Sequence, residues 1–180
     1  MRPTWPDHRI TYEEWAAMPE SEFRVELVEG LIVESPSRST WHQKAAGRLT
    51  IRLDDQLPRS LTALAGVAVV LDRERPTVRV PDMIVTSSSV LEPGHDHPTA
   101  AEVRLCAEIL SEATEHLDRA VKFAEYAAAG IPQYWIIDVG PPTTLLAYVL
   151  VGNTYELSDA STLEVANHRV TIDLDTLVRR

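Results

Sequence analysis

The chain has 180 residues, of which 44% are hydrophobic and 24% are charged, a composition typical of one soluble globular domain. Its formal net charge of −10 at pH 7 argues against indiscriminate electrostatic binding to nucleic acids or anionic membranes, so a nucleic-acid function would need a local basic patch or bridging metal ions. No apolar run approaches the ~20 residues of a transmembrane helix, the N-terminus lacks the apolar segment of a secretory signal, and the single Cys106 cannot form an intrachain disulfide, which together predict a cytoplasmic protein.

The first elements along the chain are predicted to be a short helix and a hairpin. Thr11 and Glu14 have the T-x-x-E spacing of a capping box, which predicts that a helix begins directly after Thr11. The segment RVELVEGLIVE (24–34) contains two short runs of strand-forming residues on either side of Glu29-Gly30. This pattern predicts a β-hairpin that turns at that dipeptide.

A longer helix is predicted from Thr40 to about Leu57. Thr40 and Gln43 have the spacing of a second capping box, and hydrophobic residues then recur every four positions. Three basic residues form a stripe at the same spacing along this helix: Lys44, Arg48 and Arg52. Such a stripe is either a solvated face or a ridge that contacts nucleic-acid phosphates.

Three strands are predicted in the middle of the chain, and a long polar loop (86–100) separates the second from the third. The three are GVAVVLD (66–72), VRVPDMIV (78–85) and VRLCAEIL (103–110). The third strand contains Cys106, which is expected to be an inert buried thiol.

A helix capped by Thr114 is predicted to follow and to end near Ala129, before the strand QYWIID (133–138). The resulting strand–helix–strand unit should be a parallel crossover. A hairpin is predicted over 145–158, and a last strand around 165–172. The whole pattern predicts a mixed sheet with helices packed against it.

Two of the predicted strands each carry one acidic residue among apolar neighbours, namely Asp82 and Glu108. An ionised carboxylate buried without a partner is costly, so two of them on strands that could be neighbours suggest a shared cation. Mg²⁺ prefers few carboxylates and retained waters, and such a site can hold a phosphate oxygen and activate water. Pro81 offers no N–H to a sheet, which fits a strand end where a site opens. The alternative is a pair of strand-end carboxylates that face solvent.

Several short segments, taken in order from about residue 10 to 155, resemble those of one nuclease family. They are VELVEG (25–30), Ser35-Pro36 followed by His42, RVPD (79–82), AEILS (107–111), Asp118-x-x-x-Lys122, Tyr126-x-x-x-Gly130 and QYWIID (133–138). The chain thereby resembles the Uma-two family of restriction-endonuclease-like bacterial proteins, within the PD-(D/E)XK nuclease superfamily. The resemblance implies one α/β (α+β) domain over 1–180, with a restriction-endonuclease-like αβββαβ core at about 40–140 and a mixed β-sheet flanked by helices. An N-terminal helix and hairpin and a C-terminal hairpin are added to this core.

The resemblance also implies cleavage of DNA phosphodiester bonds that depends on Mg²⁺ or Mn²⁺. By that likeness Asp82, Glu108 and the backbone carbonyl of Ile109 would ligate the metal, and Lys122 would orient or activate the water that attacks in line. The superfamily pattern places its lysine two residues after the acid, where this chain has Leu110, but Uma-two proteins are similar to this chain in carrying a lysine on the following helix.

A helical wheel places Lys122 outside the apolar side of its helix and near Asp118. The apolar arc is predicted to consist of Leu117, Ala120, Val121, Ala124 and Ala128. The alternative role for Lys122 is therefore an ordinary surface pair with Asp118 at i,i+4, worth ~0.3 kcal/mol.

Three further features are candidates for the site. Glu26 matches an acidic position of the family and would be a metal ligand or water-positioning group, or else an exposed strand residue. His42 lies in the first helical turn, where the helix dipole disfavours protonation, so it would accept a proton or contact phosphate, or simply pack. The triplet His95-Asp96-His97 carries little weight as a zinc site, because no second ligand pair has the right spacing.

These features predict a metal-dependent DNA endonuclease, and a homodimer, because two sites related by a two-fold axis are the simplest way to cut a duplex. One alternative is a catalytically inactive binding or assembly module, favoured by the acidic composition and by Leu110. Another is a phosphodiesterase that acts on RNA or nucleotides. Neither a membrane partner nor an organic cofactor is expected.

Overall fold

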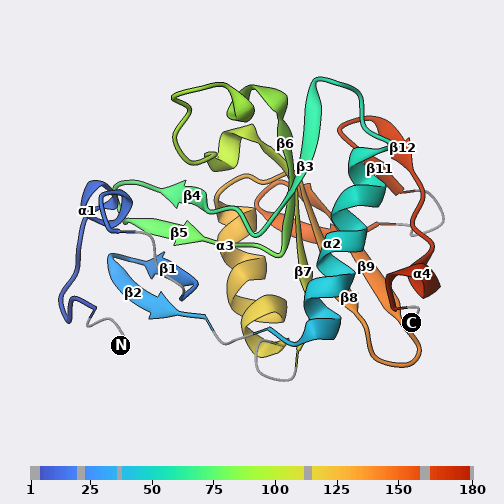
Figure 1. The fold of residues 1–180 in the computed structure, drawn as a ribbon, viewed down its shortest axis with the longest axis horizontal. Helices are drawn as coiled ribbons and strands as arrows, with labels where there is room; N and C mark the ends of the chain where they lie inside the picture. The colour runs from blue at the N-terminus through green and yellow to red at the C-terminus, as the bar shows by residue number, and fades with distance from the viewer. Residues whose placement is uncertain (1–4, 20–22, 36–37, 112–114, 159–162, 179–180) are drawn as a thin grey trace.

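The computed structural model describes residues 5–19, 23–35, 38–111, 115–158 and 163–178. Its centre is a six-stranded sheet in the order β10-β9-β8-β7-β6-β3 (Figure 1). The strands are β3 (Leu61–Ala65), β6 (Met83–Ser87), β7 (Val103–Ile109), β8 (Gln133–Asp138), β9 (Thr144–Val151) and β10 (Thr154–Leu157). β7 and β8 run parallel and the other neighbours run antiparallel, so the predicted mixed sheet and parallel crossover are confirmed.

Helices cover the two faces of this sheet (Figure 1). Helix α2 (Thr40–Asp54) packs on one face, where Leu49 and Leu53 join a cluster that includes Met83. The π-helical turn η3 (Leu117–Val121) leads directly into α3 (Lys122–Ala128), which packs on the opposite face through Tyr126. Each helix therefore closes one side of a two-sided core, as the layering of mixed sheets requires.

A second, four-stranded sheet lies beside the first and has the order β2-β1-β5-β4. Its strands are β1 (Val25–Val28), β2 (Leu31–Glu34), β4 (Val69–Asp72) and β5 (Thr77–Arg79), and the short helix α1 (Tyr12–Ala16) packs against them. The predicted hairpin is confirmed: Glu29 and Gly30 turn the chain with φ of 48° and 82°, as a two-residue turn between right-twisted strands requires. The capping box of Thr11 and Glu14 is confirmed as well.

The predicted strand VRVPDMIV is in fact two strands that belong to different sheets. β5 ends at Arg79 in the small sheet and β6 begins at Met83 in the large one. Pro81 has no N–H for a ladder, so it lies where one sheet is left and the other begins.

The order αβββαβ is confirmed, as α2, β3, β6, β7, α3 and β8, but its first strand is not the predicted one. The segment 66–72 contributes β4 to the small sheet, and Leu61–Ala65 pairs with β6 in its place. Prediction missed β3 because this stretch has neither strict alternation nor strand-forming β-branched residues except Thr62.

Other boundaries differ in detail. The side chain of Ser39, not Thr40, caps α2 by accepting from the N–H of His42. The last predicted strand is a hairpin of β11 (Leu163–Val165) and β12 (His168–Val170), followed by α4 (Leu174–Val178). The segment 86–100 includes the end of β6, the 3₁₀ turn η1 (Ser88–Leu91) and the start of η2 (Ala100–Glu102). The predicted cap at Thr114 lies outside the described residues.

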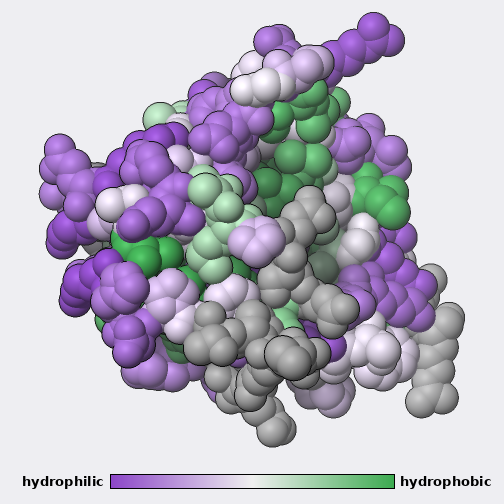
Figure 2. Space-filling model, turned by 60° about the vertical axis from the view of Figure 1, so that its left-hand side comes forward, coloured by the Kyte–Doolittle hydropathy of each residue, from purple (hydrophilic) through white to green (hydrophobic). Residues whose placement is uncertain are grey.

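The surface is mainly polar. On the face shown in Figure 2, hydrophilic side chains predominate and hydrophobic ones gather in separate patches. The large hydrophobic side chains exposed among the described residues are Leu31, Val33, Trp41, Ile51, Leu91, Val121, Val151 and Leu157. No helix in the described ranges is both long enough and apolar enough to cross a membrane.

Candidate active site

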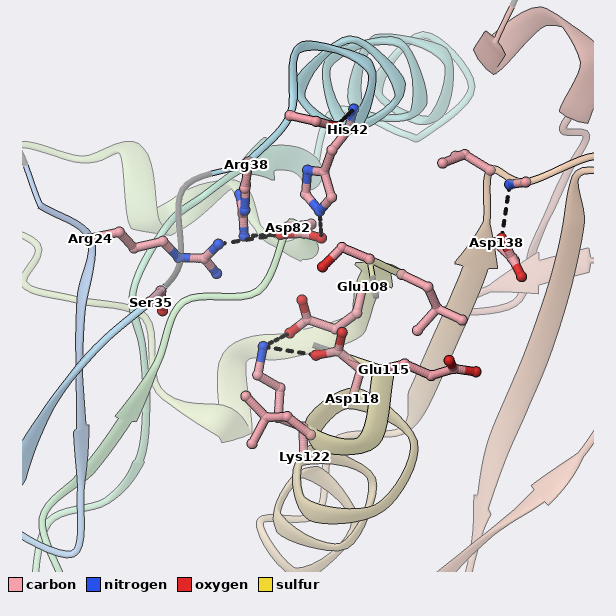
Figure 3. A pocket seen from close by; sticks show the side chains of 16 residues that line it. Arg24, Ser35, Arg38, His42, Asp82, Glu108, Glu115, Asp118, Lys122 and Asp138 are labelled. Atoms are coloured by element: carbon pink, nitrogen blue, oxygen red, sulfur yellow. Dashed lines mark hydrogen bonds and ion pairs between the residues drawn. The ribbon is translucent and has the colours of Figure 1, made fainter. Parts of the chain in front are cut away.

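A cavity of about 620 Å³ opens where β6 begins and where β7 and β8 end. Its walls include the first turn of α2, the π-helical turn η3 and residues just before β1 and α2. Figure 3 shows the polar side chains that converge here from these separate elements. Among the residues that line the cavity are Asp82, Glu108, His42, Lys122 and Asp138.

The two predicted carboxylates lie opposite each other across neighbouring strands. Met83 pairs with Ala107 and Ile84 with Cys106 in the antiparallel β6–β7 ladder, so the same register places Asp82 opposite Glu108. Both residues are only 2% exposed. Since directly opposed residues share a face of a sheet, the pairing explains why two acids 26 positions apart (108 − 82) meet in one cavity.

Asp82 is surrounded by hydrogen-bond donors. Its Oδ1 faces Arg24 Nη1 at 3.3 Å and also pairs with Arg38 Nη2. Its Oδ2 accepts from the backbone N–H of Ile109 at 2.8 Å and lies 2.8 Å from His42 Nε2. Four donors around one carboxylate offset the cost of burying its charge.

Glu108 belongs to a second cluster on the opposite wall. Its Oε1 accepts from Lys122 Nζ at 2.8 Å and from the Tyr126 hydroxyl at 2.9 Å. Lys122 Nζ also lies 3.2 Å from Asp118 Oδ1, and the Lys122 side chain is only 5% exposed. The predicted i,i+4 pair therefore exists, but it is buried rather than on the surface.

The prediction of which side of the Lys122 helix packs against the protein is wrong. The buried side chains are Asp118, Lys122, Tyr126 and Ala127, whereas Ala120, Val121, Ala124 and Ala128 are exposed. The first reason is that aromatic side chains bury far more apolar area than alanines, so Tyr126 and Phe123 decide which face packs.

The second reason is the π-helical turn. The backbone N–H of Lys122 donates to the carbonyl of Leu117, an i→i+5 bond, and the Tyr134 hydroxyl donates to the carbonyl of Asp118 at 2.8 Å. A wheel drawn at a uniform α-helical period cannot represent this wider turn, which shifts the residues before it relative to those after it. Lys122 consequently faces Glu108.

Glu26 lies behind Lys122 and is not among the residues that line the cavity. It is 1% exposed, accepts from Arg79 Nη1 at 2.8 Å and from the N–H of Val80 at 3.0 Å, and lies 4.0 Å from Lys122 Nζ. Arg79 also pairs with Glu125 on α3, to which it donates two hydrogen bonds of 2.7 Å each. The small sheet is thus joined to α3 through a buried ion-pair network.

This network sets the charges of its members. Burial alone would raise the pKa of the Glu26 carboxyl, but the positive charges of Lys122 and Arg79 outweigh burial and lower it below its usual value. Burial would likewise lower the pKa of the Lys122 ammonium, but Glu108, Glu26 and Asp118 together raise it above its usual value. Lys122 is therefore a cation at neutral pH.

His42 is held against Asp82 from the first turn of α2. Burial is the main cause that lowers the pKa of His42, and it outweighs both the hydrogen bond to the backbone of Ile109 and the charge of Glu108. With Nε2 directed at Asp82, the other ring nitrogen, Nδ1, is buried and has no hydrogen-bond partner in the described residues. A neutral imidazole that donates from Nε2 satisfies this arrangement.

The predicted basic stripe does not face the cavity, because none of its three residues lines it. Lys44 Nζ lies over the Trp41 ring, 5.0 Å from its centroid. Arg48 Nη1 donates to the carbonyls of Thr176 at 2.8 Å and Leu177 at 3.3 Å, and so ties α2 to α4. Arg52 alone is exposed. The stripe as a continuous phosphate ridge is therefore not supported.

Arg48→Ala is expected to lower the free energy of unfolding by about 1–2 kcal/mol, because charge-assisted hydrogen bonds to the last carbonyls of α4 are lost. Urea unfolding followed by circular dichroism measures the change. The matched Arg52→Ala, on the exposed side of the same helix, should change stability by no more than about 0.5 kcal/mol. Equal effects in the two variants would mean that the α2–α4 tie contributes nothing.

The imidazoles of the triplet His95-Asp96-His97 contact other polar side chains. His95 Nε2 lies 2.8 Å from Glu102 Oε1, whereas His97 Nδ1 lies 3.3 Å from the Tyr12 hydroxyl. Outside the triplet the two imidazoles thus contact different residues. Cys106 is fully buried, and burial followed by the charge of Glu108 raises the pKa of its thiol, as expected for an inert cysteine.

The oxygen donors at the cavity suit a hard divalent cation, since Asp82 and Glu108 are opposed carboxylates and Ile109 ends β7 beside them. Across the described ranges, no three side chains of the types His, Cys, Asp and Glu are already arranged to hold a metal ion. Two carboxylates, one backbone carbonyl and retained waters would suffice for Mg²⁺. A cation at Asp82 Oδ1 would have to take the place of at least one guanidinium.

Among the polar residues of this region for which no role at the site was predicted are Arg24, Arg38, Asp118 and Tyr126. Arg24 and Arg38 have no sequence pattern that relates them to Asp82, and they reach it only because the small sheet and the start of α2 fold beside β6. Asp118 and Tyr126 could have been found, because with Lys122 they form an i, i+4, i+8 series of polar side chains on one helix face.

The chain is similar to known proteins in sequence and in fold. The model of the Uma2 family, described as "putative restriction endonuclease", matches residues 11–175. Among solved structures, the chain is similar to a protein from Anabaena variabilis ATCC 29413 described as "a putative nuclease belonging to DUF820". The TM-score is 0.69 at 20% sequence identity, over 94% of this chain and 97% of that chain. No curated protein matches the chain.

Proposed function

The chain belongs to the Uma2 family of putative restriction endonucleases, and from this premise we propose that it is a metal-dependent endonuclease that hydrolyses phosphodiester bonds of DNA. The observation that carries the proposal is the pair of opposed carboxylates, Asp82 and Glu108, in one cavity with the buried ammonium of Lys122. The shared fold supports the proposal only by analogy, because one fold can host many activities.

Asp82, Glu108 and the carbonyl of Ile109 would hold Mg²⁺ or Mn²⁺. When bound, such an ion polarises a phosphate oxygen and lowers the pKa of a coordinated water. The residues of the chain then have to bind the phosphate, orient the water and stabilise the negative charge that grows on the phosphate. The cavity offers a site shielded from solvent, in which fixed charges act more strongly than they do in water.

Lys122 fits the last of these tasks. Its buried carboxylate neighbours, Glu108 first among them, raise its pKa and so favour the ammonium form. A fixed ammonium beside Glu108 instead stabilises negative charge on the phosphate. We therefore assign Lys122 as an electrostatic catalyst rather than a general base.

Glu26 and His42 are better suited to positioning than to direct chemistry. Glu26 is occupied by Arg79 and the N–H of Val80, and its charge helps to keep Lys122 protonated. His42 directs Nε2 at Asp82 and buries Nδ1, so its ring fixes the orientation of the carboxylate. Neither side chain replaces Asp82 or Glu108 in the proposed metal site.

Residues 1–180 would act as one nuclease domain with its core at about 40–140, and the protein would work as a homodimer. The test is incubation of supercoiled plasmid with the purified protein. Nicked or linear DNA is expected with Mg²⁺ or Mn²⁺ and none with EDTA, and linear product at low conversion would report two sites that act together. Cleavage that survives both Asp82→Ala and Glu108→Ala would contradict the site, and a preference for RNA over DNA would change the substrate class.

A catalytically inactive binding module is the second candidate. It is favoured by one observation, namely that Asp82 and Glu108 already have cationic partners in Arg24, Arg38 and Lys122. Calorimetric titration with Mn²⁺ separates the two candidates. Absence of binding to the unmodified protein would favour the module, whereas binding that Asp82→Ala removes would favour the enzyme.

A further inference from the structure

One wall of the cavity carries two guanidinium groups to which the proposed chemistry gives no role. Arg24 lies directly before β1, and Arg38 directly before the cap of α2. Both line the cavity and both pair with the same atom, Asp82 Oδ1 (Figure 3). Their side chains are 22% and 20% exposed, so they lie at the mouth rather than in the interior.

The guanidinium of Arg24 is incompletely satisfied. Its Nε and Nη2 atoms are buried and have no hydrogen-bond partner within the described residues, and the ion pair of Nη2 with Glu26 is long, at 3.9 Å. A buried donor without a partner costs free energy, and this cost is larger for a charged group. The guanidinium of Arg24 therefore has buried N–H donors that no acceptor in the described residues satisfies.

Asp82 cannot serve these arginines and a metal ion at the same time. A carboxylate has about four lone-pair sites. Arg24, Arg38, His42 and the N–H of Ile109 together supply four donors to it. His42 and Ile109 are fixed by α2 and β7, whereas the arginines are the more exposed partners, so a cation at Asp82 would displace the arginines.

We propose that Arg24 and Arg38 form a clamp for a backbone phosphate of the nucleic-acid substrate, which Asp82 holds in place until a metal ion takes the carboxylate. This inference rests on the proposed function. Guanidinium groups bind phosphate oxygens with paired N–H donors, and two of them on one wall match the oxygens of one phosphate group. When a metal ion displaces the two arginines from Asp82, their guanidinium groups bind the phosphate instead. The arginines and Asp82 then each have a partner of opposite charge in the cavity.

The first test is DNA binding without cleavage. Fluorescence anisotropy of a labelled DNA duplex in CaCl₂ is measured over a range of salt concentrations. The double variant Arg24→Gln/Arg38→Gln is expected to bind at least about tenfold more weakly. The slope of log affinity against log salt should fall by about 1, since the two arginines bind one phosphate and each neutralised phosphate contributes about 0.9.

A matched control removes the same charge elsewhere. The side chains of Arg9 and Arg75 are 62% and 77% exposed and lie outside the cavity. Arg9→Gln/Arg75→Gln should retain the salt slope of the unmodified protein. An equal decrease of the salt slope in both double variants, or no decrease in either, would contradict the proposed clamp.

The second test is Mn²⁺ binding in the absence of DNA. Because the arginines compete with the metal for Asp82, Arg24→Gln/Arg38→Gln should bind Mn²⁺ at least as tightly as the unmodified protein. If the arginines merely position Asp82, the folded variant should bind Mn²⁺ more weakly, and that result would overturn the proposal. The single variants Arg24→Gln and Arg38→Gln, each expected to bind the duplex more weakly and with a smaller slope than the unmodified protein, keep the test valid if the double variant does not fold.

The two proposals fail in different ways. Unmodified protein that cuts DNA, with no change of slope in the double variant, rejects the clamp and keeps the endonuclease. Unmodified protein that binds DNA without cutting it, with the slope lost in the double variant, keeps the clamp and rejects the endonuclease. Protein that binds no DNA in either form rejects both.

Discussion

Asp82→Asn is expected to abolish DNA cleavage and to weaken Mn²⁺ binding severely. Asparagine keeps the shape of the side chain but removes the charge that faces Glu108 across the β6–β7 ladder. A bound metal supplies several kcal/mol of transition-state stabilisation, so its loss should slow cleavage by about a thousandfold or more. Initial rates of plasmid nicking and calorimetric titration with Mn²⁺ measure the two effects.

The same substitution also leaves Arg24, Arg38 and His42 without their shared anion, so Asp82→Asn should unfold at lower urea concentration. Circular dichroism must therefore confirm that the variant is folded under assay conditions. Asp7→Asn is the matched control, because the Asp7 side chain is fully exposed, and both its rate and its affinity should match the unmodified protein. A folded Asp82→Asn that cuts within about tenfold of the normal rate would exclude Asp82 as an essential ligand.

Lys122→Met should separate catalysis from metal binding. Methionine preserves much of the apolar stem but removes the ammonium 2.8 Å from Glu108. Loss of one fixed charge that stabilises the transition state typically costs about 10²–10³ in rate. Mn²⁺ affinity should be retained or increased, since a cation that competes for Glu108 is gone. The combination of slow cleavage with intact metal binding is expected only if Lys122 acts on the substrate.

The stability of the Lys122→Met variant tests the role of Lys122 independently of cleavage. Removal of one partner from a buried ion pair costs about 3–5 kcal/mol, and Lys122→Met would leave Glu108, Asp118 and Glu26 without a shared cation. Lys44→Met is the matched control on the half-buried lysine of α2, and it should cost no more than about 0.5 kcal/mol. Similar losses in the two variants would mean that the buried cluster does not stabilise the fold.

Much of the fold follows from local sequence patterns. The hairpin at Glu29-Gly30, the helix after Ser39 and the parallel pair of β7 and β8 each have short-range signals, namely turn residues, caps and hydrophobic periodicity. The presence of Asp82 and Glu108 in one cavity also follows, because each is an acidic residue among apolar neighbours and a buried carboxylate needs partners. The predictions of the hairpin and the helix depend on residues close together in the chain.

The errors have non-local causes. The assignment of VRVPDMIV to one strand failed because local alternation cannot show that a strand changes sheets within three residues. The wheel for Lys122 failed because a π-helical turn, stabilised by Tyr134 from another element, altered the period. Arg24 and Arg38 were missed because only the tertiary structure brings them to Asp82. Ion pairs between residues that are far apart in the sequence produce no periodic pattern from which they could be predicted.

The change of sheet at Val80-Pro81-Asp82 affects whether the nuclease core could be transferred to another protein without the rest of the chain. β5 and β6 are consecutive in the chain, so the small sheet is attached to the large one directly beside the acidic residue at the cavity. A fragment limited to residues 40–140 would keep both carboxylates and Lys122 but would lack Arg24, Glu26 and Arg38. Its cavity would carry surplus negative charge, and Arg79 would lose Glu26, the buried one of its two counter-ions. The N-terminal hairpin is thus an integral part of the site's electrostatics, and grafting the core alone onto another protein would transfer its ligands without their charge balance.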